Sequence, residues 1–83
     1  MEKETQEKYL LSHLKPGQRA EIIGFKEKNR LSRYLQNLGM VKGKEVEYIK
    51  NAPLKDPMQL EIDKIPIIIR HSEASLIEIK LLE

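Results

Sequence analysis

The hydrophobic positions of this chain fall into several alternating runs and one run with helical spacing. Between residues 29 and 43, Leu31, Leu35 and Leu38 recur at helical spacing, and Tyr34 stands beside Leu35. Apolar residues three and four positions apart share one face of a helix. The pattern therefore predicts one amphipathic helix in a chain that otherwise has the pattern of strands.

Both ends of this helix carry the residues that helix ends favour. Asn29 is a candidate N-cap, because its side chain can accept from a free backbone N–H of the first turn. Gly39 stands where the helix must stop, since glycine takes a left-handed conformation at little cost. Met40 then falls two residues past the cap, where it is expected to contact Leu35. Gly43 opens a turn before the period changes to alternation.

Alternating runs elsewhere predict about five short strands. Pro66 lies within one of them and lacks an N–H, so that strand should be at an edge. Ile68 should point away from the inward side chains of the same strand. Asp56-Pro57 is expected to lock the loop before the third long strand, and Ser72 is expected to cap a single helical turn. The predicted strands cover residues 20–25, 45–50, 58–62, 65–70 and 76–81.

About five short strands, with one helix after the first long strand, predict a mainly β fold. We expect this fold to be a small, strongly bent antiparallel barrel. Flat sheets would leave edges that so short a chain could not cover. Residues 1–8 are polar and have no apolar period, so we expect a flexible lead-in there. Residues 9–83 are expected to form a single domain.

Composition narrows the class of protein. The 83 residues include no cysteine, which excludes disulfides and thiolate chemistry. No apolar run reaches the roughly 18 residues of a membrane span, so we expect a cytoplasmic protein with no membrane insertion. The net charge is only +2, with Glu and Lys interspersed, whereas nucleic-acid-binding domains usually gather a larger basic excess. We therefore expect no nucleic-acid partner.

The chain offers little for catalysis. Ser12-His13 and His71-Ser72 are only sequence neighbours, and a nucleophilic site would also need a positioned carboxylate. The histidines and carboxylates have no recognisable metal-ligand spacing, and there is no phosphate-binding glycine loop. The expectation is a protein with no catalytic residues, no metal site and no cofactor.

Basic side chains gather around the predicted start of the helix, where they oppose the helix dipole. Helix stability alone would not select them, so a docking surface for an acidic patch is one interpretation. A solvated charged face is the other, because Glu27 lies inside the cluster. The candidate partner-binding residues are Lys26, Lys28, Arg30 and Arg33, with Met40 and Val41 as apolar contacts.

Several short motifs, in order, resemble the FeoA family of ferrous iron transport accessory proteins. The resemblance covers most of the chain from Leu11 to Ile79. Lys64 departs from the family pattern, because a glycine usually occupies that turn. The matching residues are Leu11–Gly17, Arg33–Leu35, Leu38–Met40, Lys42-Gly43, Val46, Ala52–Leu54, Asp56-Pro57, Ile69-Arg70, Glu73-Ala74 and Ile77.

The resemblance implies an SH3-like β-barrel without catalytic activity. It also implies a role beside the membrane ferrous iron permease FeoB, whose cytosolic G-protein region would be the partner at the inner face of the membrane. The same module is found fused to iron-dependent repressors of the DtxR type, so a free-standing regulatory domain is one alternative. A small nucleic-acid-binding barrel is another, although few aromatic residues are present to stack bases. The protein is expected to be a monomer or a weak homo-oligomer.

Overall fold

The computed structural model describes residues 9–51 and 56–82. The predicted lead-in at residues 1–8 and part of the loop before Asp56 lie outside these residues. The strands are β1 (Tyr9–Leu10), β2 (Arg19–Phe25), β3 (Glu45–Asn51), β4 (Met58–Ile62), β5 (Ile65–Ile69) and β6 (Ile77–Leu82). The helical segments are η1 (Leu11–His13), a single 3₁₀ turn, α1 (Arg30–Asn37) and α2 (His71–Ala74).

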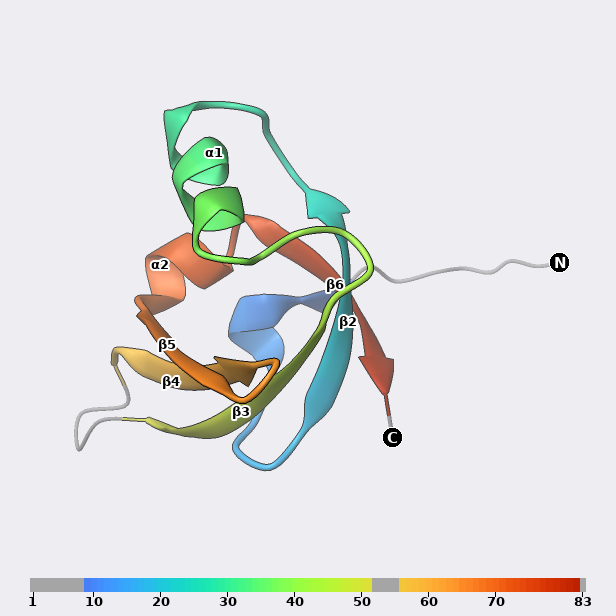
Figure 1. Cartoon of the computed structure of the whole chain (residues 1–83), viewed down its shortest axis with the longest axis vertical. Coiled ribbons are helices and arrows are strands. Elements are labelled where there is room, and N and C mark those ends of the chain that lie inside the picture. The colour runs from blue at the N-terminus through green and yellow to red at the C-terminus, as the bar shows by residue number, and fades with distance from the viewer. Residues whose placement is uncertain (1–8, 52–55, 83) are drawn as a thin grey trace, which may run out of the picture.

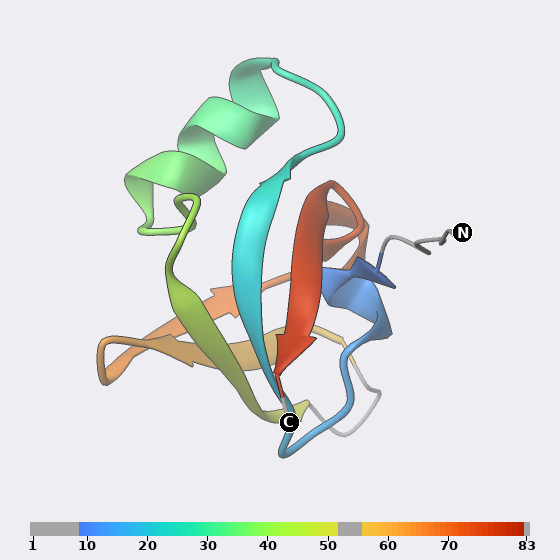
Figure 2. The same ribbon diagram turned by 90° about the vertical axis from the view of Figure 1, so that its right-hand side faces the viewer.

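The described strands form one antiparallel sheet in the order β1-β6-β2-β3-β4-β5. In Figure 1, α1 stands at one end of this sheet. Figure 2 shows β2 and β6 side by side, with β4 and β5 crossing behind them. The register shifts between Ile22 and Gly24 in β2, and between Tyr48 and Lys50 in β3. Such bulges bend a strand, which helps so short a sheet to curl over one core.

The predicted mainly β barrel with one amphipathic helix after its first long strand is confirmed. The alternation along β4 places Met58, Leu60 and Ile62 in the core, as expected. The two-residue strand β1 adds a sixth strand by pairing with β6. The fully buried side chains include Leu11, Ala20, Ile22, Leu35, Met40, Val46, Tyr48, Met58, Leu60, Ile69, Ala74 and Ile77.

The strand β5 is at the end of the described sheet, which agrees with the expectation from Pro66. Ile62 and Ile65 flank the two-residue turn, and in such a hairpin the flanking residues exchange backbone hydrogen bonds. Hydrogen-bonded and non-hydrogen-bonded pairs alternate along the strands, so the next pair, Glu61 with Pro66, is not hydrogen-bonded. The missing N–H of Pro66 therefore belongs to the open side of the strand. Ile68 also points outward, and its side chain is 62% exposed.

Two details of the second half differ from the sequence-based expectations or extend them. Ser72 does not cap α2, because Arg70 is its N-cap and donates its backbone N–H to Glu73 Oε1 at 2.8 Å. The turn between β4 and β5 has positive φ at Asp63 (54°) and Lys64 (68°) without glycine. Both residues take the left-handed conformation that a type I′ hairpin turn requires.

Candidate partner-binding surface

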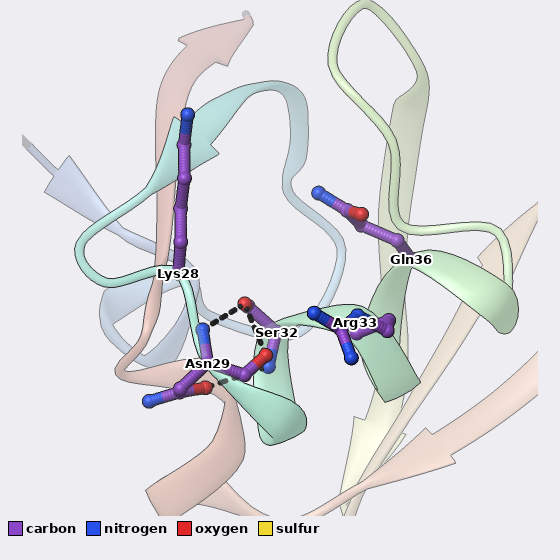
Figure 3. Close-up of a pocket in the computed structure, with 5 residues that line it drawn as sticks. All are labelled: Lys28, Asn29, Ser32, Arg33 and Gln36. Atoms are coloured by element: carbon purple, nitrogen blue, oxygen red, sulfur yellow. Dashed lines mark hydrogen bonds between the residues drawn. The ribbon is translucent and has the colours of Figure 1, made fainter.

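The start of α1 is fixed by reciprocal capping within the chain. Asn29 is the N-cap, and its Oδ1 accepts from the Ser32 backbone N–H at 3.0 Å. Ser32 Oγ accepts from the Asn29 backbone N–H at 2.8 Å, as Figure 3 shows. Two backbone donors that a helix start leaves unpaired are thereby satisfied. The residues just before and after Asn29 consequently have a defined position.

The end of α1 forms two hydrogen bonds that wrap back onto the helix. Gly39 has φ +113°, and its N–H donates to the Gln36 carbonyl at 2.9 Å. The Met40 N–H donates to the Leu35 carbonyl at 3.1 Å. This pair of bonds defines a Schellman motif, in which the second residue past the cap packs against the helix. Gly43 also has positive φ, at +94°, and its N–H donates to the Ile22 carbonyl.

The Schellman motif corrects one expected partner contact. Met40 has 0% exposure and belongs to the core with Leu35. The chain reversal that places Met40 after Gly39 also turns its side chain inward, so Met40 cannot be an apolar contact on the surface. Val41, the next residue, is 36% exposed and remains accessible.

The expected basic residues all lie at the surface around the start of α1. Lys26 and Lys28 are exposed in the link from β2, and Arg30 and Arg33 are exposed on the helix. Within the described residues, no ion pair engages any of these four side chains. Glu27 lies among them and accepts a hydrogen bond from Asn29 Nδ2 at 3.2 Å. The cluster is thus a net basic surface whose donors face solvent.

A shallow hollow of about 310 Å³ lies within this basic surface. Figure 3 shows the Lys28 side chain extending away from the Asn29–Ser32 cap, while Arg33 and Gln36 project from the helix. The positive end of the helix dipole adds to the field of these side chains. Such an arrangement can attract and hydrogen-bond acidic groups. The lining residues are Lys28, Asn29, Ser32, Arg33 and Gln36.

Asp56 has a different environment, at the first turn of α2. Its Oδ1 accepts from the His71 backbone N–H at 2.9 Å and lies 3.0 Å from His71 Nδ1. The Arg70 guanidinium lies 3.7 Å from Asp56 Oδ2. The hydrogen bonds from the His71 backbone and ring, with the charge of Arg70, hold the pKa of the Asp56 carboxyl below its usual value. Asp56 and the adjoining Pro57, which follows a cis peptide bond, thus connect the loop to α2.

The two histidines are in separate local contacts. His13 Nδ1 accepts from the Leu10 backbone N–H at 3.2 Å, and its ring meets Tyr9 edge to face. His71 contacts Asp56, 15 residues earlier, which sequence inspection missed because nothing local signals so distant a partner. In residues 9–51 and 56–82, no three His, Cys, Asp or Glu side chains come together as a metal-binding group.

The fold is that of a small SH3-like β-barrel, and the start of α1 carries a basic surface. None of the helices among the described residues is long and apolar enough to cross a membrane. The sequence profile of the FeoA domain matches residues 9–81. This chain therefore belongs to the FeoA domain family.

Three relatives carry the comparison further. A Campylobacter jejuni protein named "Putative Fe(2+) transport protein A" is 31% identical over 72 residues, which are 87% of this chain and 97% of that protein. A Porphyromonas gingivalis fusion of Fe(2+) transport protein A with the Fe(2+) transporter FeoB is 29% identical over 72 residues, 87% of this chain and 8% of the fusion. The crystal structure of Stenotrophomonas maltophilia FeoA complexed with zinc, described as a procaryotic SH3 domain protein, has a TM-score of 0.76 and 25% identity. That match covers 87% of this chain and 89% of the other.

Proposed function

We propose that this protein is a non-enzymatic cytoplasmic accessory protein of ferrous iron uptake. In this role it binds the cytosolic G-protein region of a FeoB-type membrane transporter and supports or regulates transport. The observation that carries the proposal is the Porphyromonas gingivalis fusion, in which a segment similar to this chain shares one polypeptide with a FeoB transporter. Covalent fusion holds two modules at high effective concentration, which favours direct binding between them.

The basic surface around the start of α1 is the proposed docking region. Its basic residues are Lys26, Lys28, Arg30 and Arg33. Of the two apolar contacts expected from the sequence, Val41 is exposed and belongs to this region. The absence of an ion-pair partner for the four basic side chains within the described residues supports this role. An acidic patch on the transporter could engage them without first breaking a pair inside this protein. Rim charges of this kind act mainly on the rate of association.

Charge reversal at two positions tests the proposal. The Arg30→Glu/Arg33→Glu variant should bind the purified cytosolic region of the FeoB-type transporter from the same organism more slowly, with an association rate reduced about ten-fold at low salt. The difference should shrink as ionic strength rises, because the Debye length is only about 10 Å at 0.1 M. Surface plasmon resonance at several salt concentrations measures both quantities.

A matched control separates local from general charge effects. Lys15→Glu/Lys50→Glu makes the same change in net charge at two exposed sites away from α1. This control should associate at nearly the parent rate. Melting of the Arg30→Glu/Arg33→Glu variant should stay unchanged or rise slightly, because acidic residues favour a helix start by about 0.3–1 kcal/mol each. Equal slowing by both variants would overturn the assignment of this surface, and no binding by the parent protein would overturn the function.

A further inference from the structure

The helix α1 leaves much of its apolar surface uncovered. Of its eight residues, only Ser32 and Leu35 are buried. Tyr34 is 50% exposed and Leu38, the C-cap, is 36% exposed, while Leu31 is half-buried against the core. A surface helix normally turns its apolar stripe toward the core and its polar residues toward solvent. The sequence pattern predicts such a stripe, but the structure buries only one edge of it.

Helical geometry separates this exposed edge from the basic hollow. Successive residues of an α-helix are about 100° apart, so Leu31, Tyr34 and Leu38 lie within about 60° of one another. The same rotation places Arg33 and Gln36, which line the hollow, on the other flank of the buried face. Arg30 precedes Tyr34 by one turn and therefore borders the apolar edge. We call Leu31, Tyr34 and Leu38 the α1 stripe.

The α1 stripe extends toward β5 rather than ending at the helix. A Cβ atom placed on Gly39 would lie 3.9 Å from Ile67 Cδ1, so the end of α1 adjoins this strand. Ile65 is on the same side of β5 as Ile67, two residues earlier, and is 60% exposed. Val41, after Gly39, is also accessible. Exposed apolar side chains thus lie on the helix, on the loop that follows it and at the start of β5.

We infer that the α1 stripe is the apolar anchor site for an acidic amphipathic helix of the partner. This inference rests on the proposed function and assigns the anchoring role, expected at Met40, to Tyr34 and Leu38. The chemistry of the partner follows from charge complementarity, since Arg30 borders the stripe and the other three basic side chains lie nearby without ion-pair partners in the described residues. Hot spots of interfaces are enriched in Tyr and Arg, and they are surrounded by a polar rim.

The dimensions of the stripe favour a helix as the occupant. From Leu31 to Leu38 the stripe covers seven residue steps, or about 10.5 Å at 1.5 Å per step. Two turns of a partner helix would present apolar anchors three, four and seven residues apart, which matches the spacing of Leu31, Tyr34 and Leu38. A helix with acidic residues beside its apolar face would place them against Arg30. The basic surface would then steer the encounter, and the α1 stripe would hold the complex together.

The division of roles predicts a kinetic separation. The Tyr34→Gln/Leu38→Gln variant should raise the dissociation rate from the purified cytosolic region of the FeoB-type transporter about ten-fold, equivalent to about 1.4 kcal/mol, because it removes the anchoring side chains. Its association rate should stay within about three-fold of the parent rate, with the same salt dependence. The Arg30→Glu/Arg33→Glu variant should show the opposite pattern. Surface plasmon resonance separates the two rates.

A matched control makes the same chemical change elsewhere. Ile23→Gln/Ile68→Gln replaces two exposed apolar residues in β2 and β5, and it should dissociate at the parent rate. Thermal melting of each variant checks the fold, which should be retained because all four positions are exposed. Unchanged dissociation of the Tyr34→Gln/Leu38→Gln variant from a partner that the parent binds would overturn this inference alone. If the parent protein itself does not bind the transporter region, the proposed function and this inference are both overturned.

Sedimentation of the isolated protein tests the competing occupant. If a second copy of this chain covered the α1 stripe, the parent would sediment as a dimer that the Tyr34→Gln/Leu38→Gln variant dissociates. That result would overturn the inference of a partner helix. If the parent protein sediments as a monomer alone and as a complex with the transporter region, the inference is supported.

Discussion

Asp56 shows how one exposed carboxylate can connect two segments that are distant in sequence. It accepts from the backbone and lies beside the ring of His71, and the Arg70 side chain is close to its second oxygen. The sequence indicated a loop lock at Asp56-Pro57, because an X-Pro step restricts the backbone locally. It could not indicate the other half of the lock. That half depends on the fold bringing α2 to this loop, which no local pattern encodes.

The lowered pKa of Asp56 makes the lock sensitive to acid. A carboxyl with a lower pKa in the folded state contributes stability above its unfolded value, near 3.8, and loses it as pH falls through the folded value. Asp56→Asn removes the charge but keeps an oxygen that can accept from the His71 N–H. The melting temperature of the parent should therefore exceed that of Asp56→Asn at pH 7, and the difference should narrow below pH 3.8. A difference that stays constant down to pH 2 would show that the ionised carboxylate adds nothing.

At the level of the single element, the limits of α1 were predictable and its orientation was not. Capping by Asn29 and termination at Gly39 depend on residues within one turn of each end, so the sequence carries them. Which apolar residues the helix buries depends on how it sits on the sheet. Periodicity treated Leu31, Tyr34, Leu35 and Leu38 as one face, yet only Leu35 is fully buried. The burial of Met40 likewise follows from the Schellman motif. The sequence indicated this turn, but it did not show that the turn buries Met40 completely.

Termination of α1 by a positive φ at Gly39 predicts a large cost for a β-branched residue there. Gly39→Val should lower the free energy of unfolding by about 1–3 kcal/mol, because non-glycine residues are strained in this region. Space is not the cause, since the nearest atom to a Cβ at Gly39 would be Ile67 Cδ1 at 3.9 Å. Urea unfolding measures the change.

Gly24→Ala is the matched control for this substitution. Gly24 does not have a positive φ, and a Cβ there would meet only the Glu78 side chain, at 3.6 Å. The control should remain within about 0.5 kcal/mol of the parent. If Gly39→Val and Gly24→Ala cost the same, backbone conformation at Gly39 would not be what ends the helix.

At the level of the whole molecule, alternation predicted the strands, and the bent barrel followed from the need to cover short sheets. Strand order was less accessible, because pairing of β1 with β6 joins the two ends of the described chain. Two-residue strands such as β1 have too few positions to show a period. The basic part of the candidate surface was predictable, because its charged residues are close together in the sequence. The approach of β5 to the end of α1 was not predictable, because it depends on the tertiary fold.

The open edge of β5 has a consequence for the solubility of the protein. Only Pro66 and Ile68 direct backbone groups outward from the interior of this strand, and Pro66 has no N–H to offer. At the strand end, the Arg70 N–H is already bonded to Glu73. Along β5 as far as Arg70, all of which the structure describes, a neighbouring molecule that extended the sheet would find a single N–H donor, at Ile68. Proline at an edge is one of the devices that prevent strand-to-strand aggregation.

Pro66→Val should remove this protection. Valine favours strands and restores a donor two residues from Ile68, so light scattering of a concentrated solution should increase with time while the parent stays clear. Adding Ile68→Lys to the same variant should return the solution to clarity, because a lysine on the edge opposes stacking of like chains. A Pro66→Val solution as clear as the parent would mean that the edge is protected by something other than proline. The absence of one backbone N–H, at Pro66, would thus set the protein concentration above which the molecules begin to polymerise.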